Sequence, residues 1–320
     1  MSVKNMSDLM AVKSDSGEVL GKLLYFSLSN VQVERNKLTE ICNGMGVPYS
    51  GASRTGAVDA FRSATGDIYK RVVEGGHIYK VFCRDNQRDG DIISRELVKE
   101  TLGVETNRYT KLANIQFDRT ANSFGYGNVE YDPHVDPYEF CAQAETLFEI
   151  YKTCAGRKQI EGILLDYLDS MEAIKISIHG RLYFVPRTHM TEVDIFEDFV
   201  EALNQNNRNG TSLTVNSMYV LDDQKQRDKM ASEFYNHIRK EIETYQERAE
   251  HFIASDCQSI AIMNRWILKI EGLEEKKCHY EELLQKELDE LGAEFTTLRM
   301  FSQELQIKAR RLESSKKLAA

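Results

Sequence analysis

Between Met230 and Phe252 the chain reads MASEFYNHIRKEIETYQERAEHF, with an apolar residue at every third or fourth position. This spacing places the apolar residues on one face of a helix, as at the a and d positions of a coiled coil. A second run with the same spacing extends from Met263 to Leu312, and residues 221–312 contain no proline. The last third of the chain therefore predicts long helices whose apolar face needs a partner surface.

These helices can bury their apolar face in two ways. A reversal of the chain at 255–259 makes a hairpin in which the two runs cover each other. A single helix of about 135 Å, at 1.5 Å per residue, makes a coiled coil between chains instead. Both arrangements stay open, and we expect self-association through the second run. Its interface is expected at Leu284, Leu288, Leu291, Phe295, Leu298 and Leu305.

Upstream of these helices, the chain mixes strands and helices. The segment His77–Arg84, HIYKVFCR, alternates two rows of side chains with the two-residue period of a strand. Locally joined strands predict an α+β fold: a mixed, largely antiparallel sheet body with a long C-terminal helical hairpin or coiled coil. Other strands are expected at 19–33, 91–98, 108–119, 129–131, 174–186 and 212–221, and helices at 34–45, 57–73 (interrupted at Gly66), 138–171 (divided at Gly156) and 194–203.

The composition suggests an ordinary intracellular protein divided into four segments. With a net charge of −9 over 320 residues, a protein that mainly coats nucleic acid is disfavoured, although a local basic patch is not. Six scattered cysteines and the lack of an export signal or membrane span indicate reduced thiols in the cytoplasm. The expected segments are a flexible N-terminus (1–18), an α+β body (19–221), the helices (222–313) and a basic tail (314–320).

Aromatic and basic residues near the best strand suggest a second function, nucleic-acid binding. Tyr69, Tyr79 and Phe82 lie among basic residues, so one face of a sheet can stack bases between cations. The cationic end of the last helix suits either the helix dipole or phosphate. The expected contact residues are Lys70, Arg71, Lys80, Arg84, Arg310 and Arg311.

Signatures of catalysis or cofactor binding are weak. The glycines within 44–56 and 123–128 lack the order of a phosphate-binding loop, and they are expected in turns. Asp132, His134 and Asp136 lie between prolines, a pattern that a turn explains without a metal. We therefore expect no cofactor and no metal site, and we favour a non-enzymatic protein over an enzyme.

Two parts of the chain carry distinctive motifs. They are YFSLSNVQVERNKLTEICNGMGVP (Tyr25–Pro48) followed by VDAFRSAT (Val58–Thr65), and GRLYFVPRTH (Gly180–His189). In these motifs the chain resembles an uncharacterised family of Gram-positive phages and mobile elements. The resemblance implies an origin in a mobile element and transfers no active residue. It also implies a host or phage protein as a partner, for instance a defence component that the protein blocks.

Overall fold

The computed structural model describes residues 19–49, 56–74, 77–102, 108–176, 180–210, 213–255 and 258–318. The chain forms two compact units, one of residues 1–28, 164–202 and 212–320 and the other of residues 29–163 and 203–211. The described residues contain eight α-helices and eleven strands, and their strand pairs are antiparallel. The predicted α+β class with C-terminal helices is thus confirmed. The segment expected at 1–18 lies outside the described residues.

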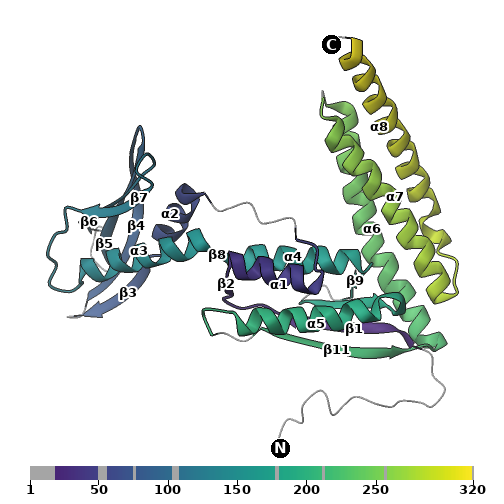
Figure 1. Ribbon diagram of the computed structural model, residues 1–320, viewed down its shortest axis with the longest axis horizontal. Coiled ribbons are helices and arrows are strands. Elements are labelled where there is room, and N and C mark those ends of the chain that lie inside the picture. Colours follow the sequence, from purple (N-terminus) through teal and green to yellow (C-terminus); the bar gives the residue numbers. More distant parts are fainter. Residues whose placement is uncertain are drawn as a thin grey trace, which may run out of the picture. The chain divides into compact units, whose positions relative to one another are not determined.

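The unit of residues 29–163 and 203–211 contains a five-stranded antiparallel sheet (Figure 1). Its strands follow chain order. The strand that begins with HIYKVFCR is longer than expected. β4 continues through most of DNQRDG (residues 85–90) before the hairpin turns. Gly90, with φ +51°, occupies this turn, where a side chain would be strained. The strands are β3 (Tyr69–Glu74), β4 (His77–Asp89), β5 (Ile92–Leu102), β6 (Arg108–Asp118) and β7 (Ser123–Gly127).

Two helices, α2 (Ala57–Gly66) and α3 (Pro137–Thr153), cover one face of this sheet. The start of α3 is specified locally, because Pro137 is its first residue and Asp136 Oδ1 accepts a hydrogen bond from the Tyr138 N–H at 3.0 Å. The core between helices and sheet contains Ala60, Phe61, Ala64, Val81, Leu97, Leu112, Ile115, Phe117, Phe140, Ala144 and Phe148.

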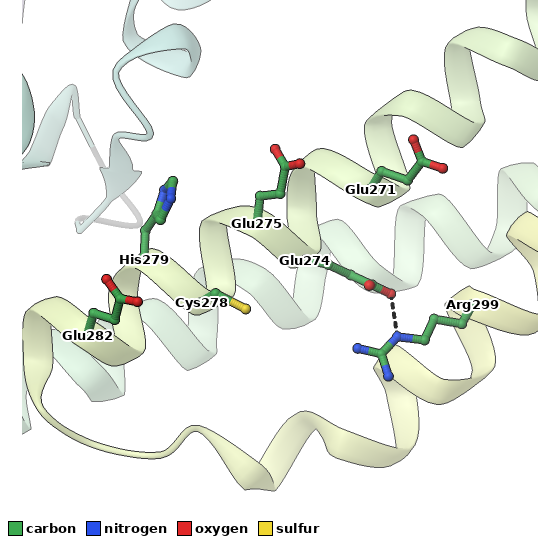
Figure 2. A pocket seen from close by; sticks show the side chains of 7 residues that line it. All are labelled: Glu271, Glu274, Glu275, Cys278, His279, Glu282 and Arg299. Atoms are coloured by element: carbon green, nitrogen blue, oxygen red, sulfur yellow. Dashed lines mark hydrogen bonds and ion pairs between the residues drawn. The ribbon is translucent and has the colours of Figure 1, made fainter.

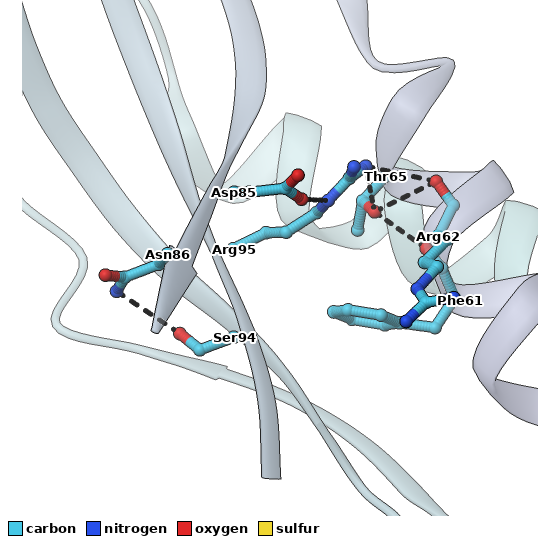
Figure 3. Close-up of polar contacts among 7 residues, drawn as sticks. All are labelled: Phe61, Arg62, Thr65, Asp85, Asn86, Ser94 and Arg95. Carbon is cyan, nitrogen blue, oxygen red and sulfur yellow. Dashed lines mark hydrogen bonds and ion pairs between the residues drawn. The ribbon is translucent and has the colours of Figure 1, made fainter. Parts of the chain in front are cut away.

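Arg95 of β5 ties the end of α2 to the sheet (Figure 3). Its Nη1 donates to Arg62 O at 3.1 Å and to Thr65 Oγ1 at 3.0 Å, while its Nε donates to Asp85 Oδ1 at 2.8 Å. A cation at this position also complements the negative end of the helix dipole. The helix therefore ends at Gly66, and the continuation expected to residue 73 is wrong, because those residues pair with β4 as β3.

A short strand pair and one more helix complete this unit. Strand β2 (Gln32–Glu34) pairs with β8 (Cys154–Gly156), which separates α3 from α4 where the sequence predicts a division. Helix α1 (Arg35–Met45) ends at Gly46 in the left-handed conformation. A strand was also expected at 129–131, and this is wrong. The edge strand is β7, so its glycines lie in a strand and not in a turn.

The other unit contains a four-stranded antiparallel sheet in the order β11-β1-β10-β9. Helix α5 packs on one of its faces, where Lys22 Nζ donates to Asp194 Oδ1 at 2.6 Å and the rings of Phe26 and Phe196 lie 5.7 Å apart. The elements are β1 (Val19–Ser27), α4 (Arg157–Ser170, part of this unit from Leu164), β9 (Ile174–Lys175), β10 (Leu182–Pro186), a 3-10 turn (Arg187–His189), α5 (Met190–Gln205, part of this unit to Ala202) and β11 (Thr214–Leu221).

Three helices follow in the same unit: α6 (Gln224–Ala254), α7 (Ile260–Leu284) and α8 (Gly292–Leu318) (Figure 1). The chain reverses after α6, at the position expected for a hairpin. It reverses again at Gln285, whose backbone is left-handed with φ +50°. The second run is therefore two helices. Leu288, which is fully buried, fixes this second reversal through its N–H, which donates to Glu281 Oε1 at 2.8 Å. The boundary expected after residue 221 does not separate units, because β11 and these helices belong to one.

The six residues expected at an interface between copies are buried within the single chain. Five of them share a core with Phe234 of α6 and with Leu20 and Phe184 of the sheet, and the sixth packs beside Ala249. Their assignment needs correction, because α6 and the sheet already cover the apolar stripe that a coiled coil would use. The exposed fractions are Leu284 1%, Leu288 0%, Leu291 0%, Phe295 3%, Leu298 0% and Leu305 0%.

Candidate nucleic-acid interface

The five-stranded sheet has a second face, opposite α2 and α3. Directly paired residues of antiparallel strands point to the same side, so the register assigns side chains to faces. Val81 and Leu97 point into the helix-covered core, which places their sequence neighbours on the opposite side. We call this second side the outer face. It carries Tyr69, Arg71 and Val73 of β3, Ile78, Lys80, Phe82 and Arg84 of β4, Glu96, Val98 and Glu100 of β5, and Tyr109 and Lys111 of β6.

Large side chains on the outer face are open to solvent. Tyr69 is 62% exposed, Val73 70% and Tyr109 50%. These two tyrosines lie three strands apart, about 14 Å at the usual strand spacing. The Arg84 guanidinium lies over the Tyr109 ring, 5.9 Å from its centroid. The outer face thus offers separate aromatic platforms with a cation beside one of them.

Four cations and two carboxylates set the charge of the outer face. Glu96 takes hydrogen bonds from Arg84 Nη2 at 2.8 Å and Nε at 3.0 Å, and Lys111 Nζ lies 3.1 Å from its other oxygen. The hydrogen bond from Arg84 lowers the pKa of Glu96, burial opposes this, and Lys111 adds to the lowering. Glu96 therefore stays ionised at neutral pH, and it offsets part of the charge of its two cations.

The second carboxylate, Glu100, contacts two residues of the outer face. Lys80 Nζ lies 3.8 Å away and the Tyr109 hydroxyl donates to it at 3.1 Å. Arg71, paired across the strands with Lys80, has no ion-pair partner among the residues that the structure describes. Residues 69–127 contain ten Lys or Arg and eight Asp or Glu, in contrast to the net −9 of the whole chain. The sheet is therefore the less acidic part of an acidic protein.

The structure separates the contact residues that the sequence suggests. Arg71, Lys80 and Arg84 lie on the outer face, while Lys70 is on the helix-covered face, with its Nζ 3.6 Å from Glu139 and over the Phe140 ring. Among the aromatic residues, Tyr69 and Phe82 share the outer face, while Tyr79 is buried on the other and stacks on His134. Arg310 and Arg311 are exposed near the end of α8, in the other unit.

Among the aromatic and basic residues of the outer face, sequence reasoning missed two, Tyr109 and Lys111. They alternate within RYTKL, the pattern of a strand, and this signal places them on a common face of β6. Which face this is depends on the register with β5, where Glu100 pairs with Tyr109 and Val98 with Lys111.

Other candidate sites have structural explanations in the same unit. Asp132 forms an ion pair with Lys99, both being nearly buried, and its Oδ1 accepts from the His134 N–H at 3.0 Å. Asp136 caps α3, as described above. Among the residues that the structure describes, no three His, Cys, Asp or Glu side chains are grouped to hold a metal ion. None of the described helices has the length and apolar composition that a membrane span needs.

The comparison with protein families gives a match over most of the chain. The model of a family of unknown function, DUF6744, matches residues 19–311. The chain belongs to this family. Comparisons with curated proteins and with solved structures gave no match. The matched residues fall in both units, and the family has no assigned function.

Proposed function

We propose that this protein binds single-stranded nucleic acid through the outer face of its five-stranded sheet. The observation that carries the proposal is the placement of two exposed tyrosines, Tyr69 and Tyr109, on the same side as four cations. Flat sheets that present aromatic rings stack two or three unpaired bases, and nearby cations contact the backbone. A role in replication, recombination or regulation fits such binding.

The six residues expected to mediate self-association are buried in the core of the single chain. Nucleic-acid binding is therefore the better supported of the two expected functions. The proposal does not require catalysis, a cofactor or a metal. We further propose, from the sequence resemblance, that the gene belongs to a phage or mobile element. The genes that flank it test this origin, because a chromosomal housekeeping cluster would contradict it.

The charges on the outer face predict modest affinity with a clear dependence on salt. Contact with three phosphates gives a slope of log K against log salt of about −2 for a single strand. Each stacked base contributes about 1–3 kcal/mol. Glu96 and Glu100 reduce the attraction, so binding is expected to be strongest at low salt.

The test is fluorescence anisotropy with a labelled 12-nucleotide single strand at low salt. We expect Tyr69→Ala to weaken binding about tenfold to hundredfold through loss of one stacking platform. The matched control is Tyr131→Ala, because Tyr131 is 91% exposed but lies in the segment after β7, outside the sheet. Equal losses from the two tyrosine variants would contradict the proposal.

The two faces of β3 provide a second matched pair. Arg71 and Lys70 are adjacent, exposed and basic, but only Arg71 lies on the outer face. We expect Arg71→Ala to weaken binding and to make the salt slope shallower by about 0.7, while Lys70→Ala changes neither. Equal effects would point to non-specific attraction, and no binding of the wild type at low salt would refute the proposed function.

A further inference from the structure

The helices α7 and α8 present an outer surface that faces away from their core. Leu298 and Leu305 point into the core, whereas Met300 and Ile307, on the opposite side of α8, are 60% and 50% exposed. On α7, Leu268 is 68% exposed. A helix surface with large apolar side chains at this spacing is typical of a contact between helices. We call this region, with the charged groups beside it, the α7–α8 surface.

Two of the three apolar residues, Leu268 and Ile307, lie at the same level because the helices run antiparallel. Arg299 Nε donates to Glu274 Oε1 at 2.8 Å, and Gln306 Nε2 lies 3.5 Å from Glu271 Oε1. These two contacts show which residues of α7 and α8 lie side by side, that is, at the same level along the axis of the helix pair. Leu268 is one turn from Glu271 and Ile307 is next to Gln306, so both lie near the same level of the pair.

One side of this level is acidic. A groove of about 500 Å³ lies between the helices, and Figure 2 shows the carboxylates that project along it. Arg299 is paired with Glu274, and His279 Nδ1 lies 2.7 Å from Glu172 Oε1, outside the groove lining. The lining thus has four carboxylates against Arg299 and His279, so it is acidic. The lining residues are Glu271, Glu274, Glu275, Cys278, His279, Glu282 and Arg299.

The other side of the same level is basic. Arg310 and Arg311 of α8 and Arg265 of α7 are exposed there, beyond Ile307 and Leu268 respectively. At 1.5 Å per residue, Arg311 lies about 6 Å from Ile307 in one direction along the helix axis. Glu271 and Glu275 lie about 4.5 and 10 Å from Leu268 in the opposite direction.

We propose that a second copy of this chain docks on the α7–α8 surface in an antiparallel arrangement with twofold symmetry. The axis passes near Leu268 and Ile307, so these two residues of both copies meet at the centre. The rotation brings Arg265, Arg310 and Arg311 of each copy to the level of Glu271 and Glu275 of the other. A twofold contact uses the same patch on both copies, and this patch is complementary to itself in charge. A parallel arrangement would oppose like charges.

The surface is large enough for a stable contact. Two adjacent helices of about 25 residues present a face of about 38 by 20 Å, or on the order of 700 Å² per copy. Stable protein interfaces bury about 800 Å² per partner. This inference is independent of the proposed nucleic-acid binding, because it uses neither the outer face nor any residue of the five-stranded sheet.

The test is the solution mass of the full chain, measured by light scattering over a range of protein concentrations. We expect a dimer for the wild type and a monomer for the double variant Met300→Asp, Ile307→Asp, with the dissociation constant raised about hundredfold. Val73→Asp is the matched control, since it adds a charge at an equally exposed apolar residue of the other unit and should leave the mass unchanged.

A charge exchange tests the orientation. Arg310→Glu with Arg311→Glu should weaken the dimer at least about tenfold, and adding Glu271→Arg with Glu275→Arg in the same chain should restore it. A wild type that stays monomeric at about 100 μM, far above the working range of a specific dimer, would overturn the inference. So would charge variants that lose oligonucleotide binding at unchanged mass, because the arginines would then contact phosphate.

Discussion

Leu298 and Met300 lie two residues apart on α8, and their replacement by alanine distinguishes a core from an interface. Leu298 is fully buried, and Met300 is 60% exposed. Leu298→Ala removes three carbon atoms from a packed core, about 2.4 kcal/mol of transfer free energy, and the cavity left behind adds to this. We expect a total loss of about 3–4 kcal/mol in the free energy of unfolding. Met300→Ala should change it by less than about 0.5 kcal/mol.

The assay is urea unfolding followed by circular dichroism at 222 nm, at a protein concentration low enough to keep the chain monomeric. Leu298→Ala should lower the midpoint with an unchanged m-value, because the surface exposed on unfolding is nearly the same. Its solution mass should equal that of the wild type. If Leu298→Ala instead keeps the stability of the monomer and abolishes an oligomer, the residue lies between copies, and the intramolecular packing described here is refuted.

Two further predictions concern buried contacts in the separate units. A Cβ at Gly21 would lie 2.0 Å from the backbone oxygen of Val185, so Gly21→Ala should destabilise its sheet by about 3 kcal/mol, and an unchanged melting temperature would contradict this. Burial raises the pKa of Asp132, but the hydrogen bonds from Lys99 and from a backbone N–H outweigh it, and the net pKa is lowered. A lowered pKa means that ionised Asp132 stabilises the fold above about pH 4 and that this stability is lost as the pH falls through the folded-state pKa. Asp132→Asn should therefore lower the free energy of unfolding by about 3 kcal/mol at pH 7, because Lys99 is left buried and unpaired. The variant should also lose less stability than the wild type as the pH falls below about 4. If the stability of variant and wild type falls in parallel with pH, Asp132 does not have this role.

The residues of the outer face show how far a site can be predicted from this sequence. Arg71, Lys80 and Arg84 were expected to act together, and the strand period alone puts Lys80 and Arg84 on one side. The period also separates Lys70 from Arg71 once both are in a strand, but this segment was expected to be helical. Tyr109 completes the outer face from β6, a strand whose register with β5 is set by pairing across the sheet.

Periodicity in the sequence determined most of the elements: the alternation in HIYKVFCR, the helical spacing after residue 221, and the breaks at Gly156 and 255–259. It also showed which residues share a face of an element. It did not show what covers that face, because the same apolar stripe is buried equally well in a hairpin, in a coiled coil or against a sheet. Tertiary packing settled this by placing α6 and the four-stranded sheet over Leu284 and Phe295. Which surface buries each apolar stripe depends on contacts between residues far apart in the chain, and no local pattern encodes these contacts.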